Sequence, residues 1–205
     1  MNYDALASPE QVARTTDALR AKGVQVFVVD TGAEALTKIK GLIPVGASVM
    51  NGASRTLEQI GYVEYLKSGS HGWNNLKAAI LAETDPTQQQ ILRKQAVLSD
   101  FYLGSVHALA ENGEFVVGSN TGSQLPHIVF TSPNLIFVVS TKKIVPTMAD
   151  AMRRLEDYVV PLEDQNIRAK YNIGTMLSKV LIFKGENPRS TRKITVILVN
   201  ENLGF

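Results

Sequence analysis

Runs of apolar, largely β-branched residues constrain the fold of this chain most strongly. Residues 24–30 form one such run. A strand that is buried on both faces of a parallel sheet has a sequence of this type, and we expect residues 24–30 to be such a strand. Further strands are expected over residues 45–50, 135–139, 180–183 and 194–199.

Segments with helical periodicity lie between the expected strands. Ser8 and Pro9 begin a helix that we expect to end at Gly23, and residues 31–43 carry apolar side chains along one stripe. A strand, a helix and a strand joined by short connections form a βαβ unit with a right-handed crossover. The sequence therefore predicts an α/β fold, a mostly parallel sheet with helices on both faces. The 205 residues suit one compact domain, residues 1–205.

Two shorter helices are expected in the middle of the chain. The spacing predicts a helix over about residues 87–98, with Ile91, Leu92 and Leu98 facing inward. A second, brief helix is expected around residues 106–110.

Composition excludes several kinds of site. The chain contains no Cys, so it has no disulfide, no Cys nucleophile, and no zinc or iron–sulfur site held by its own thiolates. The net charge of +2 is too small to favour nucleic acid, and the excess of Arg and Lys over residues 167–193 indicates a solvated or ligand-facing surface. The N-terminus lacks a secretory signal pattern, and no apolar run is long enough to cross a bilayer. We therefore expect a cytoplasmic protein without a membrane or nucleic-acid partner.

The segment from Gly46 to Gly61 combines an apolar strand, a small Gly-containing turn and a short helix. Ser54 and Thr56 lie in this turn, where free backbone N–H groups and the helix dipole favour negative charge. The pattern predicts a site for a phosphate or a carboxylate. The alternative is a helix that uses Ser54 only as its N-cap.

Two further segments are candidates for the same anion site. Residues 118–123 form a polar, Gly-rich loop of the kind that approaches ligands closely. Lys143 follows the strand over residues 135–139 and therefore lies near the carboxyl edge of the sheet, where ligands gather in open α/β sheets. A solvated strand end explains Lys143 equally well. The predicted ligand-binding residues are Asn51, Gly52, Ala53, Ser54, Arg55, Thr56, Asn120, Thr121, Gly122 and Lys143.

Signatures of other chemistry are missing from the sequence. The three His residues, His71, His107 and His127, are spaced too irregularly for a metal motif, so no metal is predicted. A structural role is the more common one for His107 and His127, which lie near apolar segments. The chain has no nucleophile elbow, no P-loop and no Gly-x-Gly-x-x-Gly pattern. No cofactor is identified.

Glu111 is the carboxylate with a candidate catalytic role. It lies between an apolar segment and Asn112-Gly113, the dipeptide most typical of a tight hairpin, which introduces a strand over residues 114–117. Partial burial would raise the pKa of Glu111 and suit it as a general base or nucleophile. An exposed residue at a turn is the simpler interpretation.

Taken together, these segments resemble the LUD-domain family of lactate-utilisation proteins. The matching pieces are residues 52–61, 98–114, 141–146, 160–161 and 199–205. The resemblance implies a fold similar to that of sugar-phosphate isomerases and family I CoA transferases. In that wider group the loop after an early strand often binds phosphate, and Gly52 to Thr56 would be its equivalent.

The same resemblance bears on catalysis and partners. Family I CoA transferases carry a nucleophilic glutamate in a Glu-Asn-Gly context, which Glu111-Asn112-Gly113 resembles, although many LUD proteins have Thr at the position of Asn112. The LUD family is associated with oxidation of lactate to pyruvate beside partner subunits that hold iron–sulfur clusters. Without Cys, this chain would resemble the cluster-free member.

Three functions are consistent with the sequence. The first is a LUD protein of lactate or organic-acid utilisation that binds a small anionic metabolite at the loop after the second strand, with such iron–sulfur subunits as its expected partners. The second is an acyl- or sugar-phosphate-processing enzyme that uses Glu111 with Lys143 nearby. The third is an interaction protein in which the loop is only a helix cap. The first two differ in whether Glu111 faces the same cleft as Ser54, Thr56 and residues 118–123.

Overall fold

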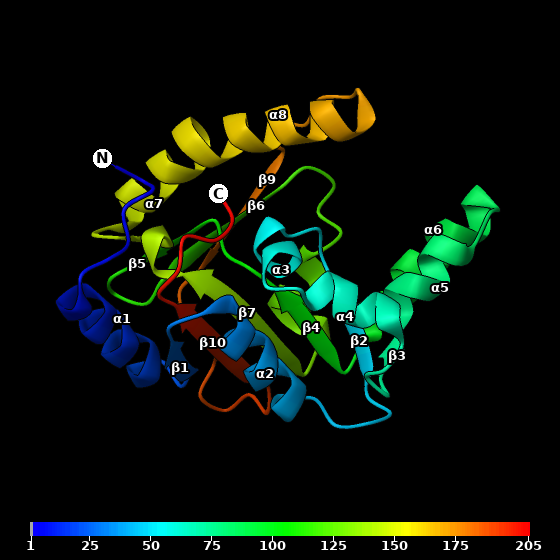
Figure 1. Ribbon diagram of the computed structural model, residues 1–205, viewed down its shortest axis with the longest axis horizontal. Helices are drawn as coiled ribbons and strands as arrows, with labels where there is room; N and C mark the ends of the chain where they lie inside the picture. Colours follow the sequence, from blue (N-terminus) through cyan, green and yellow to red (C-terminus); the bar gives the residue numbers. More distant parts are fainter. Residues whose placement is uncertain (1) are drawn as a thin grey trace.

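A six-stranded parallel sheet forms the centre of the computed structural model, which describes residues 2–205 (Figure 1). Its strand order is β1-β10-β7-β4-β2-β3, and each neighbouring pair is parallel. The strands are β1 (Gln25–Val29), β2 (Ser48–Asn51), β3 (Asn74–Asn75), β4 (Phe101–Gly104), β7 (Asn134–Ser140) and β10 (Lys193–Val199). The predicted α/β fold with a mostly parallel sheet is therefore confirmed.

The central strands β7 and β10 are buried almost throughout, as their continuous apolar sequences predict. The prediction that residues 24–30 are buried on both faces was wrong. β1 pairs only with β10 and lies at the edge of the sheet, so Val28 keeps 49% of its surface exposed. An apolar run does not reveal which strand has a single neighbour.

Helices cover one face of this sheet. They are α2 (Gly32–Leu42), α3 (Arg55–Gln59) and α4 (Tyr62–Ser68). Ile39, Leu57 and Tyr62 are buried there against β7 residues such as Ile136 and Val138. Burial of such apolar surface is the main stabilising contribution to this layer. On the opposite face, α1 (Pro9–Ala21) packs beside β1, and a capping box at Ser8 fixes its start as predicted.

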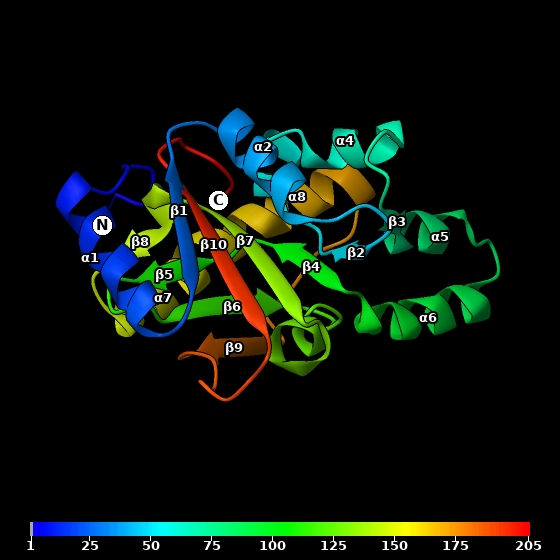
Figure 2. The same cartoon turned by 90° about the horizontal axis from the view of Figure 1, so that it is seen from below.

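A second, four-stranded sheet covers the rest of that opposite face. Its order is β8 (Ile144–Val145), β5 (Ala108–Ala110), β6 (Phe115–Ser119) and β9 (Lys179–Phe183). Its strands cross those of the parallel sheet in Figure 2. Phe115 contacts Phe137 of β7 with ring centroids 5.2 Å apart, so the two sheets share one apolar core.

The second sheet corrects one prediction and confirms another. The brief helix expected around residues 106–110 was wrong, because Ala108–Ala110 form β5, paired with both β6 and β8. Pairing with distant strands outweighs the helix propensity of Ala. The predicted hairpin is present: β5 and β6 are antiparallel, and Gly113 adopts a φ of +81° in the turn.

A long helical segment covers the outer face of the second sheet. It comprises α7 (Met148–Arg154), a π-helical turn over Leu155–Val159 and α8 (Val160–Tyr171). Ala151 and Leu155 are buried against Ala108 and Val116 of the second sheet. In Figure 1 this segment runs across the molecule above α3, and α8 thereby covers one side of the cavity described below.

A helical hairpin projects beyond β3. It consists of α5 (Leu76–Ala82) and α6 (Pro86–Gln95), followed by a 3-10 turn over Ala96–Leu98 (Figure 2). The prediction that Ile91 and Leu98 face inward was wrong, because Leu98 is 74% exposed and Ile91 is also exposed. α6 lies beyond the edge of the sheet, so its apolar stripe has no sheet to cover. No helix in the described part of the chain is long and apolar enough to span a membrane.

Candidate functional site

A cavity of about 330 Å³ lies at the carboxyl ends of β2 and β4. The loop after β2, the end of β6 and one side of α8 enclose it. This is the edge at which open α/β sheets bind ligands, and the volume suits a small molecule. Its polar lining includes Ser54, Arg55, Thr56, Glu58, Ser105, His107, Ser119, Asn120, Thr121, Ser123, Gln124, Lys143, Glu163, Asn166, Lys170 and Thr175.

The segments singled out in the sequence meet at this cavity. Residues 52–56, Asn120, Thr121 and Lys143 all line it, although they come from distant parts of the chain. Asn51 and Gly122 do not line it. Asn51 is buried beneath the loop, where its Nδ2 donates to the Gly52 carbonyl, and the N–H of Gly122 donates to Ser119 Oγ within the turn.

Lys143 lies at the closed end of the cavity and is only 4% exposed. It ends a short 3-10 helix, Thr141–Lys143, which follows the central strand β7. Its Nζ lies 3.0 Å from Thr56 Oγ1, 3.1 Å from Ser105 Oγ and 3.3 Å from the Val106 carbonyl oxygen. Within residues 2–205, no carboxylate forms a salt bridge with this amine. Burial lowers the pKa of Lys143 well below its usual value, and the charges of Arg154 and Lys142 lower it further.

The neighbouring Lys142 has a different environment. Its Nζ lies 3.1 Å from Asp4 Oδ1 and 2.7 Å from Asn202 Oδ1. Asp4 also accepts a hydrogen bond from the hydroxyl of Tyr158. These two bonds lower the pKa of Asp4, so the carboxylate stays charged beside Lys142. Of two adjacent buried lysines, one therefore has an anionic partner and the other has none within residues 2–205.

Arg154 adds a second buried cation near Lys143. Its side chain is fully buried, and one guanidinium nitrogen donates to the His107 carbonyl. The rings of Tyr3 and Tyr158 lie 5.6 and 5.2 Å from its guanidinium carbon. Burial lowers the pKa of Arg154 to about 10, which keeps it charged at neutral pH. The charge of Asp4, which forms its salt bridge with Lys142, also acts on Arg154.

His107 lines the cavity, whereas a structural role was expected from the sequence. Its Nδ1 accepts a hydrogen bond from the Gly118 N–H at 3.1 Å. The ring proton of the neutral form is therefore on Nε2. Burial lowers the pKa of His107 to about 3, with smaller contributions from Lys143 and Arg154. A neutral imidazole that donates from Nε2 is available at this wall, and the apolar sequence around His107 gave no sign of it.

Ser54 and Thr56 have separate functions in the loop after β2. Ser54 Oγ accepts a hydrogen bond from the Leu57 N–H and caps α3, as the simpler sequence interpretation held. Thr56 is buried and contacts Lys143 instead. Gly52 is required by close packing, because a Cβ at this position would lie 2.7 Å from the Tyr102 hydroxyl oxygen.

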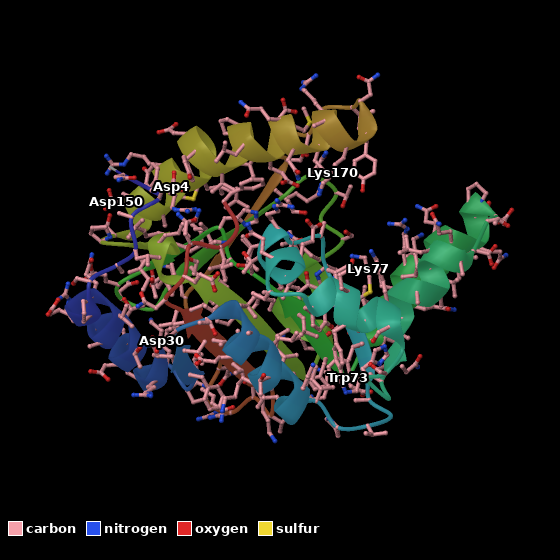
Figure 3. All side chains as sticks on the ribbon, in the orientation of Figure 1. Asp4, Asp30, Trp73, Lys77, Asp150 and Lys170 are labelled. Atoms are coloured by element: carbon pink, nitrogen blue, oxygen red, sulfur yellow. The ribbon has the colours of Figure 1, made fainter. Side chains whose placement is uncertain are left out.

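Charged side chains of both signs surround the outer part of the cavity. Glu58 forms ion pairs with Arg55 at 3.3 Å and with Lys170 at 3.5 Å. The second pair links α3 to α8, from which Lys170 extends in Figure 3. Burial raises the pKa of Glu163, also on α8. These exposed pairs contribute little to stability, but they place charges of both signs in the lining of the cavity.

The segment around Gly204 packs closely against Lys143 and Thr56. Gly204 adopts a φ of +70°, and its N–H donates to Gln59 Oε1. A Cβ at Gly204 would lie 2.8 Å from Lys143 Nζ and would also clash with Thr56 Oγ1. Glycine is therefore needed for both the backbone conformation and the close approach. In the described residues, no group of His, Asp and Glu side chains is placed to hold a metal ion.

Comparison with known proteins identifies the family. The family model for the LUD domain matches residues 12–204, nearly the whole chain. The chain belongs to the LUD-domain family. Among solved structures, this LUD-domain chain is similar to a DUF162 family protein from Deinococcus radiodurans, with a TM-score of 0.57 and 13% sequence identity. The match covers 96% of this chain and 100% of the other, and at this identity it shows a shared fold. No curated protein matches.

Glu111 of this LUD-domain chain does not line the cavity. It lies at the β5–β6 turn, where its carboxylate accepts hydrogen bonds from Gln11 Nε2 at 3.0 Å and from Arg14 Nη2 at 2.8 Å. The bond from Gln11, followed by that from Arg14, lowers its pKa, whereas the catalytic hypothesis needed a raised one. The structure therefore does not bring Glu111 together with Ser54, Thr56 and the loop after β6. Family membership supports a role related to lactate utilisation in general terms.

Proposed function

We propose that this LUD-domain protein binds a small organic acid, of the size of lactate, in the cavity at the end of β2. The proposal rests on one observation. Lys143 is buried at the closed end of the cavity with three neutral oxygen partners and without a carboxylate partner in the described residues.

The charge balance around Lys143 favours an anion. Lys142, Lys143 and Arg154 are all buried, and among the described residues Lys142 is the one of the three that forms a salt bridge with a carboxylate, that of Asp4. Burial lowers the pKa of Lys143, and the proximity of like charges lowers it further. A bound carboxylate would stabilise the ammonium form, because opposite charges attract strongly where water is excluded.

Hydrogen-bond donors for a carboxylate are available on the other walls. The hydroxyls of Ser105 and Thr56 lie beside Lys143, and the imidazole of His107 can donate from Nε2. Charge-assisted hydrogen bonds to a carboxylate are among the stronger ones in proteins. The acid would therefore be held by neutral donors and one cation.

This binding would serve lactate utilisation, in which oxidation of a hydroxy acid releases two electrons. The chain has no Cys and cannot hold an iron–sulfur cluster through its own thiolates. Partner subunits with such clusters, and a cytoplasmic location, are part of this proposal. The alternative use of Glu111 on acyl or sugar-phosphate substrates is not carried forward, because Glu111 lies apart from the cavity.

The test is calorimetric titration and thermal shift with lactate, with its neutral amide and with inorganic phosphate. A ligand that binds only the folded protein raises the unfolding midpoint. We expect lactate to bind and its amide to fail. Lys143→Met should remove this preference, whereas Lys67→Met, at an exposed lysine paired with Glu64, should keep it. Equal binding of lactate and its amide, or an unchanged preference in Lys143→Met, would overturn the proposal.

A further inference from the structure

The hydrogen-bond partners of Lys143 accommodate an uncharged amine. A neutral amine has two N–H donors and one lone pair, and two of its three partners here are hydroxyls, of Thr56 and Ser105. The amine can donate to the Val106 carbonyl and to one hydroxyl while the other hydroxyl donates to its lone pair. The geometry therefore satisfies a neutral Lys143 completely.

A charged Lys143 has no carboxylate partner within residues 2–205, whereas the neighbouring Lys142 has one. Burying an ammonium group without an anion is costly, and Lys142 meets this cost through Asp4. Lys143 has no such partner within residues 2–205, and two cations lie nearby. Desolvation and neighbouring cations are the two conditions that turn a lysine into a nucleophile near neutral pH.

We propose that Lys143 is a nucleophile that forms an imine with the carbonyl group of an oxo acid in this cavity. This deepens the proposed function, on which it rests, by naming the substrate class: an acid with a ketone or aldehyde group next to the carboxylate. The carboxylate is held by the surrounding donors, and the carbonyl carbon lies against Nζ.

The step is a condensation that needs no oxidant or reductant. The lone pair of Nζ attacks the carbonyl carbon, a C–N bond forms, and the C=O π electrons move to oxygen, which takes up a proton. The nitrogen then loses a proton to give the neutral carbinolamine. The oxygen takes up a second proton and leaves as water when the C–O bond breaks and the nitrogen lone pair forms the C=N bond, and the nitrogen finally loses its remaining proton, so that two protons are taken up and two are released. The products are the imine and one water molecule. The hydroxyls of Thr56 and Ser105, 3.0 and 3.1 Å from Nζ, are placed to transfer these protons.

The chain also restricts the direction of approach to the amine. Gly204 packs so closely that a Cβ there would lie 2.8 Å from Nζ. Thr56, Ser105 and Val106 occupy the other hydrogen-bonding positions. Lys143 lines the cavity, so a small carbonyl compound would approach Nζ from that side and displace the hydroxyl that donates to its lone pair; exposed lysines such as Lys67 lack this enclosure.

Reductive trapping tests the proposal directly. The full-length protein is incubated with pyruvate and sodium cyanoborohydride, which converts an imine into a stable secondary amine, and the modified residue is located by peptide mass spectrometry. We expect modification at Lys143 to exceed that at Lys67 in the same sample by about tenfold or more, since only the buried lysine is activated. Lactate, which has the acid group but no carbonyl, should give no adduct.

The variants separate failure of this step from failure of binding. Lys143→Met should abolish the adduct, and Lys67→Met should leave it unchanged. If Lys143→Met does not fold, peptide mapping of the protein without substitutions still shows whether Lys143 is the labelled residue. Two results would overturn the proposal that Lys143 forms an imine but leave acid binding in place. One is labelling that is spread over exposed lysines, and the other is the absence of labelling while pyruvate still raises the unfolding midpoint. Absence of both labelling and binding by any acid would overturn both.

Discussion

Lys143 Nζ lies 3.0 Å from Thr56 Oγ1, although the two residues are 87 positions apart in the chain. Thr56 belongs to α3, after β2, and Lys143 follows β7, so this contact joins the ends of two strands separated by β4. It also places the amine at the closed end of the cavity, beside the loop that the sequence marked for an anion. The stability and the chemistry of the site therefore depend on the same hydrogen bond.

Replacing Thr56 by Val should weaken the folded state and the site together. The change keeps the shape of the side chain but leaves the buried amine with one hydroxyl fewer, which we expect to cost about 1–3 kcal/mol in the free energy of unfolding. Thr16→Val is the matched control, because the hydroxyl of Thr16 is buried without a hydrogen-bond partner in the described residues. Urea unfolding should show a loss for Thr56→Val and little or none for Thr16→Val. Equal effects would contradict the assigned role of the Thr56 hydroxyl.

Replacing Gly204 by Ala should reduce ligand binding in addition to straining the backbone. Gly204 and Gly23 both have positive φ values, +70° and +78°, so each Ala variant should lose about 1 kcal/mol from backbone strain. A Cβ at Gly204 also meets Thr56 and Lys143, whereas none of the surrounding atoms lies within 4 Å of a Cβ at Gly23. We therefore expect only Gly204→Ala to reduce lactate binding, measured by calorimetry. Unimpaired binding by that variant would show that the last residues do not shape the site.

The sequence predicted the parts of this structure that depend on local pattern. β7 and β10 are recognisable because strands buried on both faces need continuous apolar residues, and the hairpin is recognisable from Asn112-Gly113. β5 could not be recognised, since a segment of three residues with helix-favouring side chains becomes a strand only through pairing with β6 and β8.

The cavity residues, too, were predictable only where the local sequence pattern determines their position. Lys143 was a candidate because a residue that follows a parallel strand lies at the ligand edge of the sheet. Its burial was not predictable, because the surrounding oxygens come from Thr56 on α3 and from Ser105 and Val106 in the loop after β4. His107 was missed for a similar reason: only the fold turns it to the cavity and gives its Nδ1 a donor from Gly118.

Stability should decrease in mild acid because of His127. Its buried ring stacks on Tyr102, and Nδ1 lies 2.9 Å from Ser132 Oγ. Burial lowers its pKa to about 4, compared with about 6.5 in the unfolded chain. Between these values the unfolded chain binds a proton and the folded protein does not. The free energy of unfolding should therefore fall by about 1.4 kcal/mol per pH unit as the pH drops from about 6.5 to about 4. His127→Gln should remove this part of the slope in urea unfolding at several pH values; an unchanged slope would contradict the assignment.

Replacing Glu111 by Gln should leave ligand binding unchanged. Its carboxylate pairs with Arg14 and Gln11 at the surface of α1, away from the cavity, so its removal alters no group that faces a ligand. Because Arg14 is largely exposed, the loss in the free energy of unfolding should not exceed about 1 kcal/mol. Because folding lowers the pKa of Glu111, this contribution is fully present above the carboxyl pKa of the unfolded chain. It is lost as the pH falls through the pKa of the folded protein, so the free energies of unfolding of Glu111→Gln and of the protein without the substitution should become equal in acid. Calorimetry with lactate, beside Lys143→Met, provides the comparison. Loss of binding in Glu111→Gln with normal folding would return the catalytic hypothesis to Glu111 and remove the assignment of the site to Lys143.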